Sequence, residues 1–208
     1  VYDYLVAPAI LALAPDHAEK IFVGKKGGGF CCPQRDIESI FIRLAREGKR
    51  VVRLKGGDPF MFGRGGEEAE ALVAAGIPFE VVPGVTSALA AAAYAGVPLT
   101  HRAHASAVVF ITGHEDPSKP DSAIHWEDYG KLGATLCLYM SMKNLETITR
   151  RLQAGGLSAE TPALPDRGRQ PLGKPARARN ARHETLRTLD AMAPADEVAA
   201  IAAAERFT

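Results

Sequence analysis

The sequence predicts an α/β fold with a parallel sheet, and two repeated features of residues 50–102 carry this prediction. Short apolar runs at residues 51–54 and 79–82 have the length and the β-branched side chains of buried strands. Each run is followed by a glycine-containing loop and then by a segment of helical character, residues 67–75 and 87–95. Strands that alternate with helices are typical of parallel α/β sheets.

The two loops place polar residues where both predicted strands end. Gly56, Gly57 and Asp58 follow the first strand, while Thr86 and Ser87 follow the second at the expected start of a helix. Adjacent glycines let the backbone turn sharply and let a ligand approach it closely. Ligands of parallel sheets bind at the carboxyl ends of strands, so the loops form either one binding site or two ordinary turns.

Arg64 lies between Gly63 and Gly65, two residues ahead of the helix predicted at residues 67–75. The glycines leave space around the arginine side chain, and Glu67 lies about one helical turn further on. Acidic residues are favourable in the first turn of a helix because of the helix dipole. Arg64 and Glu67 therefore form either a local ion pair, which contributes little to stability, or part of a functional site.

Other segments predict further elements on both sides of this region. We expect strands at residues 1–6, 21–23, 107–112 and 134–140. We expect helices at residues 34–47 and 144–154. Small and polar residues after Arg102 place a domain boundary near residue 104, which gives domains 1–103 and 104–208. Beyond residue 165 the chain has few β-branched residues, so we expect no closing strand and an incomplete second domain.

The composition excludes several classes of protein. The 208 residues are 47% hydrophobic with a net charge of +1, which suits a globular protein without general attraction to nucleic acid or anionic membranes. No apolar run is long enough to span a bilayer, and three cysteines make no disulfide framework, so a reducing cytoplasm is expected. The basic stretch at residues 167–182 favours a solvated loop over an RNA contact. His101, His104 and His114 lack partners at zinc-ligand spacing, so no metal is predicted.

Three neighbouring motifs carry a family resemblance. Residues 54–68 (LKGGDPFMFGRGGEE), 81–87 (VVPGVTS) and 96–102 (GVPLTHR) resemble the tetrapyrrole methylase family, and within it the uroporphyrinogen-III C-methyltransferases. Further matches at VYDYLV, VGKK and LYM extend the resemblance over about residues 1–165. It implies two small α/β domains with an active-site cleft between them, and a homodimer. It also implies an N-terminally truncated chain, because the family has an earlier strand, a glycine- and proline-rich loop and a helix.

The resemblance assigns residues to catalysis and to cofactor binding. Asp3, which by itself suits a solvated turn, is implied as the proton acceptor, and Lys25, otherwise a surface lysine, as the proton donor. Arg64, Glu67 and Arg102 are implied around the substrate. The residues implied to bind S-adenosylmethionine are Gly56, Gly57, Asp58, Met61, Thr86, Ser87, Met140 and Gly168.

The implied reaction moves methyl groups from S-adenosylmethionine to two carbons of uroporphyrinogen III, which gives precorrin-2 for sirohaem and cobalamin synthesis and leaves S-adenosylhomocysteine. The sulfonium already makes a good leaving group, so the protein mainly has to align sulfur, methyl and pyrrole carbon. A base must then accept the proton that the methylated ring loses. Arg64 and Arg102 suit the many carboxylates of this substrate, since a guanidinium binds carboxylate through two parallel hydrogen bonds.

Two alternatives keep different parts of this interpretation. A related methylase with another precorrin acceptor, or a diphthine synthase, would share the fold and the cofactor. A truncated chain that binds tetrapyrrole without catalysis would keep only the binding site. Met140, taken without the resemblance, fits core packing better than a cofactor contact. A substrate assay separates these alternatives.

Overall fold

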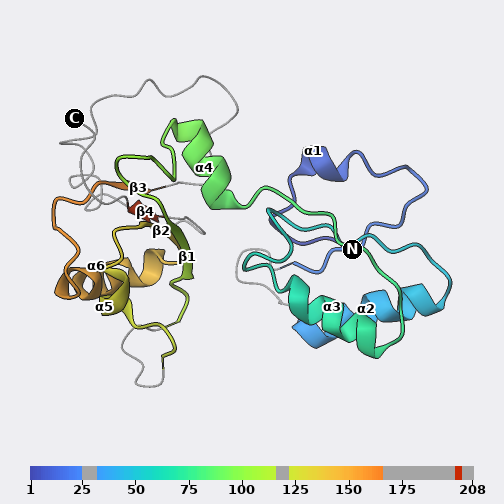
Figure 1. Cartoon of the computed structure of the whole chain (residues 1–208). Coiled ribbons are helices and arrows are strands. Elements are labelled where there is room, and N and C mark those ends of the chain that lie inside the picture. Colours follow the sequence, from blue (N-terminus) through green and yellow to red (C-terminus); the bar gives the residue numbers. More distant parts are fainter. Residues whose placement is uncertain (25–31, 116–121, 166–199, 203–208) are drawn as a thin grey trace. The chain divides into compact units, whose positions relative to one another are not determined.

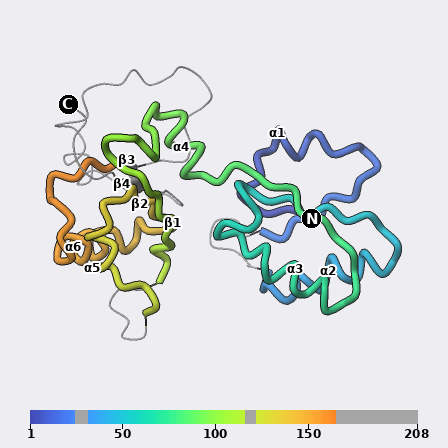
Figure 2. The backbone as a smooth tube through the Cα atoms, viewed as in Figure 1, coloured from blue at the N-terminus to red at the C-terminus, as the bar shows by residue number. Residues whose placement is uncertain are grey.

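The computed structural model describes residues 1–24, 32–115, 122–165 and 200–202. The chain divides into two compact units, Val1–Thr86 and Ser87–Thr208. Figures 1 and 2 trace the first unit from blue to green and the second, up to residue 165, from green to orange. No helix in the described ranges combines the length and apolar character that a membrane crossing requires.

The core of the first unit forms around an amphipathic helix. The helices described in this unit are α1 (Pro8–Leu11), α2 (Gln34–Arg46) and α3 (Gly65–Ala74). Buried side chains recur in α2 at Ile37, Phe41 and Leu44, which is the spacing of one helical face. Ile37 and Phe41 pack with Val23, and Leu72 of α3 packs against the same cluster. The apolar stripe predicted for residues 34–47 is therefore the face that α2 buries.

Three predicted strands of the first unit are reduced to single bridges. Tyr2 pairs in parallel with both Phe22 and Leu54, which places three chain segments side by side. Val23 N donates to Tyr2 O at 2.9 Å, and Leu54 N donates to Val1 O at 2.8 Å. The parallel arrangement follows the prediction, but the predicted length of these strands is wrong.

Local hydrogen bonding and exposure explain why these strands stop early. Leu5 N donates to Asp3 Oδ1 at 3.0 Å, so the chain turns away immediately after the bridge at Tyr2. Residues 79–82 form no strand, and the side chain of Val82 is 75% exposed. A β-branched residue favours a strand through packing on a sheet face, which Val82 lacks.

The second unit contains a mixed four-stranded sheet. Its strands, in spatial order, are β1 (Val108–Thr112), β2 (Thr135–Tyr139), β4 (Ala200–Ala202) and β3 (Ala163–Pro165). β1 and β2 are parallel, and β4 runs antiparallel to both of its neighbours. The helices are α4 (Ser87–Ala95), α5 (Trp126–Tyr129) and α6 (Leu145–Ala154), with a 3₁₀ turn at Met142–Asn144.

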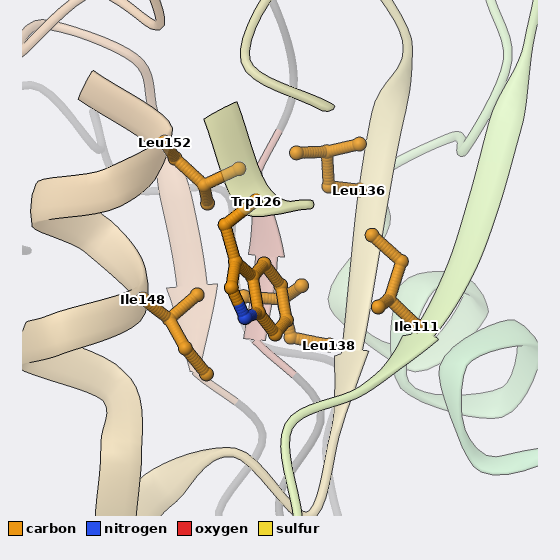
Figure 3. Close-up of a cluster of buried hydrophobic side chains, with 6 residues drawn as sticks. All are labelled: Ile111, Trp126, Leu136, Leu138, Ile148 and Leu152. Carbon is orange, nitrogen blue, oxygen red and sulfur yellow. The ribbon is translucent and has the colours of Figure 1, made fainter. Parts of the chain in front are cut away.

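Helices cover both faces of this sheet because β2 is apolar on both sides. Alternate side chains of a strand point to opposite faces. Leu136 and Leu138 belong to the cluster in Figure 3, which joins the sheet to α5 and α6: Ile111, Trp126, Leu136, Leu138, Ile148 and Leu152. Cys137 and Tyr139 lie on the other face, in a cluster with Ala88 and Ala92 of α4 and with Leu99. A central strand buried on both faces is typical of α/β sheets.

One expectation about the second unit needs revision. The prediction that no closing strand forms after residue 165 is wrong, because Ala200–Ala202 pairs with β2 on one side and β3 on the other. Backbone hydrogen bonds on both edges hold such a short strand even where the surrounding sequence has few β-branched residues. Residue contacts group α4 with the second unit, because Ala88 and Ala92 pack against Cys137 and Tyr139 of β2, and the domain boundary near residue 104 stays a prediction.

Candidate active site

The two glycine loops of the first unit are joined through one carboxylate. Asp58 Oδ2 accepts a hydrogen bond from Gly84 N at 3.0 Å, and Asp58 Oδ1 accepts one from Phe60 N at 2.9 Å. A side chain on Gly84 would collide with the carbonyl oxygen of Gly57. The backbone of Gly57 has a φ of +69°, in the left-handed region. The loops therefore lie in direct backbone contact, which only glycine at position 84 permits.

The segment that carries Asp3 reaches the same glycine loop. An added Cβ on Gly56 would lie 2.9 Å from the Cβ of Leu5. Gly24, at the end of the neighbouring segment, packs as closely on the backbone of Asp3 and Tyr4. Three parallel segments thus bring their carboxyl ends together, and this is where α/β folds bind ligands.

The Asp58 contact should respond to acid. Hydrogen bonds from Gly84 and Phe60 hold the pKa of the Asp58 carboxyl below its usual value. Because the folded-state pKa is lowered, the contribution of the carboxylate is present above the unfolded pKa of about 3.9 and is lost as the pH falls through the folded pKa. We expect the Gly84 amide proton resonance to titrate with a midpoint below about pH 3.9. An Asp58→Asn variant should lose this titration, and an unchanged titration in that variant would assign it to another group.

Arg64 is held in a backbone conformation that arginine rarely adopts. Its φ of +57° lies in the left-handed region, directly before the first residue of α3. An added Cβ on Gly63 would lie 2.7 Å from the Pro59 carbonyl oxygen, and Gly65 N donates to that oxygen at 3.0 Å. The tight turn around Pro59 therefore fixes the arginine backbone, and such strain occurs most often at functional sites.

The Arg64 side chain is paired with a carboxylate on the rim of a cavity. Its Nε lies 3.1 Å from each carboxylate oxygen of Glu67, and a terminal guanidinium nitrogen lies 2.5 Å from Glu67 Oε2. Hydrogen bonding to Glu67 raises the Arg64 pKa and lowers that of Glu67. The cavity has a volume of about 460 Å³ and is lined by Gln34, Arg35, Glu38, Arg64, Glu67, Glu70 and Ala71.

A buried network of charges connects the glycine loop to Asp3. Glu68 of α3 has a side chain only 7% exposed and accepts from Arg53 at 3.1 Å and from Lys55 at 3.3 Å. Arg53 also donates to Asp3 Oδ2 at 3.2 Å. Burial, followed by the nearby Arg53 charge, lowers the pKa of Lys55. Charges this deeply buried have to be paired, and here each carboxylate faces a cation.

Sequence reasoning missed this network. The signal was present in residues 51–55, where Arg53 and Lys55 alternate with apolar residues in a segment expected to be a buried strand. Charged residues are rarely buried unless they are paired, so two cations there require a carboxylate nearby. The sequence does not show that Glu68, rather than Glu67, provides it.

The second unit contributes a separate group of predicted site residues. Met140, at the end of β2, has a φ of +52°, again in the left-handed region. The hydroxyl of Tyr139 accepts a hydrogen bond from Ala88 N at 3.1 Å, in the first turn of α4. Ser87 is exposed beside it. The carboxyl end of β2 and the start of α4 are thereby joined, which brings Ser87 and Met140 to one end of this unit.

Comparisons with known proteins agree with this geometry. The family profile of the Tetrapyrrole (Corrin/Porphyrin) Methylases matches residues 1–164. The chain belongs to the tetrapyrrole methylase family. This confirms the resemblance, and the family's solved members confirm the α/β fold class.

Individual relatives place the chain more closely within the family. It is 53% identical over 169 residues to an S-adenosyl-L-methionine-dependent uroporphyrinogen III methyltransferase of Methanosarcina barkeri, covering 81% of this chain. It is 53% identical over 163 residues to a siroheme synthase of Neisseria meningitidis, covering 78% of this chain. The chain spans 66% of the first relative and 34% of the second.

Two solved structures of family members share the fold. A uroporphyrin-III C-methyl transferase from Thermus thermophilus, complexed with S-adenyl homocysteine, superposes with a TM-score of 0.71 at 34% identity. The superposition covers 97% of this chain and 83% of the Thermus thermophilus chain. A cobalt precorrin-4 methyltransferase superposes with a TM-score of 0.74 at 26% identity, covering 97% and 81%.

The predicted site residues of this tetrapyrrole methylase fall into three groups. Lys25 and Gly168 lie outside the described residues. The first unit holds Asp3, Gly56, Gly57, Asp58, Met61, Arg64, Glu67 and Thr86, and the second holds Ser87, Arg102 and Met140. Arg102 lies exposed in a turn beside His101, whose ring stacks on His104 with centroids 4.6 Å apart. Within the described residues, no three potential metal ligands gather.

Proposed function

We propose that this chain transfers methyl groups from S-adenosylmethionine to uroporphyrinogen III, giving precorrin-2 and S-adenosylhomocysteine in sirohaem or cobalamin biosynthesis. The observation that carries the proposal is the junction of two glycine loops through Asp58 and Gly84, beside the segment of Asp3. The junction leaves backbone without side chains at a strand-end site. The 53% identity to a uroporphyrinogen III methyltransferase supports the choice of reaction.

The cofactor is proposed to rest on the joined loops. Gly56 and Gly57 offer backbone without side chains. Thr86 is buried, and the next residue, Ser87, is exposed. The Asp58 carboxylate is engaged by two backbone amides, so we assign it the task of joining the loops. Met61, Met140 and Gly168 complete the proposed cofactor-binding set.

The substrate is proposed to meet charged side chains. Arg64 and Arg102 would bind its carboxylates, and Glu67 orients Arg64 through the contacts to its Nε. Asp3 is the proposed proton acceptor and Lys25 the proposed proton donor. Gly24 packs on the backbone of Asp3, which brings the end of that segment to the proposed proton acceptor.

A second candidate keeps the cofactor and changes the acceptor to a later precorrin. The fold similarity to a cobalt precorrin-4 methyltransferase, with a TM-score of 0.74, favours it. The higher sequence identities to uroporphyrin-III methyltransferases favour the first candidate.

Assembly and location are part of the proposal. We propose a cytoplasmic homodimer in which each chain has two functional domains with a boundary near residue 104. The net charge of +1 and the exposed apolar side chains in each unit agree with this proposal. Val82 and Val85 of the first unit are 75% and 65% exposed, and Tyr94 of the second is 72% exposed. Exposed apolar surface marks interaction sites when it is contiguous.

Calorimetry and a substrate assay test this function. We expect the chain to bind S-adenosylhomocysteine more tightly than ATP or NAD, because neither glycine loop matches the G-x-x-x-x-G-K-[ST] motif of ATP sites or the G-x-G-x-x-G motif of NAD sites. Incubation with isotopically labelled S-adenosylmethionine and uroporphyrinogen III should give a doubly methylated product. Equal or absent binding of all three ligands contradicts the cofactor assignment. Methylation of only a later precorrin selects the second candidate.

A further inference from the structure

We propose that Arg53 is a positioning residue for methyl transfer, which holds the Asp3 carboxylate where it accepts the ring proton. The inference rests on the proposed function, since it concerns the base of that reaction. Arg53 lies outside both glycine loops and joins Asp3 to the interior of the first unit. No other guanidinium among the described residues contacts this carboxylate.

The guanidinium of Arg53 is fixed by three different contacts. Its Nε donates to Glu68 Oε1 at 3.1 Å, one terminal nitrogen donates to Leu54 O at 2.9 Å, and the other donates to Asp3 Oδ2 at 3.2 Å. The side chain is 15% exposed. A planar group held at three of its edges cannot rotate without breaking at least one contact, so Asp3 faces a rigid donor.

Glu68 anchors this arrangement from within. It sits in the first turns of α3 with its side chain 7% exposed, and Gln34 of α2 donates to the same Oε1 at 3.2 Å. Lys55 donates to both of its oxygens, at 3.3 and 3.4 Å. Two carboxylates and two cations balance the formal charge of the cluster. Glu68 therefore links Arg53 to α2 and α3. Arg53 in turn holds the Asp3 carboxylate through its other terminal nitrogen.

The geometry at Asp3 suits a base. Oδ1 accepts from Leu5 N at 3.0 Å and Oδ2 accepts from Arg53, while the side chain remains 23% exposed. A carboxylate has about four acceptor positions, so two donors leave capacity for a proton. In the reaction, the methyl group leaves sulfur and bonds to the pyrrole carbon, and the ring then carries positive charge. Breaking a ring proton's bond returns its electron pair to the ring, and Asp3 takes the proton.

A double-mutant cycle in turnover tests whether Arg53 acts through Asp3. We expect Arg53→Gln to lower kcat by about a hundredfold, because small displacements of reacting groups have effects of this size. The Kd for S-adenosylhomocysteine should stay within about twofold, as expected for uncoupled sites. In an Asp3→Asn background, Arg53→Gln should lower kcat by no more than about twofold further. Equal losses in both backgrounds would overturn the proposal and leave Arg53 as a structural residue.

A matched variant and a second measurement guard this test against misfolding. Arg43→Gln removes a comparable arginine–glutamate contact, the exposed 2.8 Å pair with Glu47, and should leave kcat unchanged. Arg53→Lys keeps the charge with a single donor group, so it preserves folding better and should still lower kcat. The amide resonance of Leu5 reports the place of the carboxylate without any turnover.

The Leu5 amide resonance tests the positioning role of Arg53 independently of methyl transfer. In Arg53→Lys the Leu5 amide signal should move as the carboxylate loses its second support, while amides near Arg43 stay in place. An unmoved Leu5 signal overturns the positioning role whatever the assay shows. A wild-type chain that moves no methyl group overturns the proposed function, and with it the role of Arg53 in turnover.

Discussion

Arg64→Lys is expected to lower methyl-transfer turnover by about a hundredfold while the affinity for S-adenosylhomocysteine stays unchanged. Lysine keeps the positive charge but loses the planar fork that binds carboxylate through two hydrogen bonds. The structure adds that Glu67 already orients this fork through both of its oxygens. Arg64→Ala should have an equally severe effect. Near-normal turnover in the lysine variant would reduce Arg64 to a source of general positive potential.

A glycine variant separates this effect from folding. Arg64 has a φ of +57°, and the left-handed conformation costs a non-glycine residue roughly 1–2 kcal/mol. Arg64→Gly should therefore keep or raise the free energy of unfolding, because its ion pair is exposed and contributes little. Turnover should still be lost. Arg43→Lys, in a pair of similar exposure, serves as the control with unchanged turnover.

Gly84→Ala is expected to separate the two glycine loops. The new methyl group would collide with the carbonyl oxygen of Gly57, which is backbone and cannot turn away as a side chain does. Relief requires the loops to move apart, which would also stretch the hydrogen bond from Gly84 N to Asp58. We expect S-adenosylhomocysteine binding to weaken by at least about tenfold, or 1.4 kcal/mol, and unfolding to become easier by about 1–3 kcal/mol.

Gly66→Ala provides the matched control. Gly66 lies in α3, and an added Cβ there has no atom within 4 Å. Alanine should stabilise the helix by roughly 0.5–1 kcal/mol and leave cofactor affinity unchanged. Titration calorimetry and thermal unfolding of both variants give the comparison. If Gly84→Ala bound the cofactor as well as Gly66→Ala does, the joined loops would not form the cofactor site.

Much of the local structure was predictable because it depends on spacing along the chain. The apolar face of α2 follows from Ile37, Phe41 and Leu44, and α4 forms where alanines precede Gly96. The motif around Gly56 and Asp58 was also sufficient to indicate the family. Periodicity and local motifs record which face of an element is buried, so they can be found in the sequence.

Contacts between distant segments were decided only by the tertiary structure. Asp58 and Gly84 are 26 residues apart, and Arg53 and Asp3 are 50 apart, so no local pattern predicts either bond. The same holds for β4, which forms because β2 and β3 supply backbone partners on both sides. The spacing of residues along the chain indicates whether each side chain is buried or exposed. Which distant residues become partners depends on the tertiary fold, and that fold joined the glycine loops and buried Glu68 with its two cations.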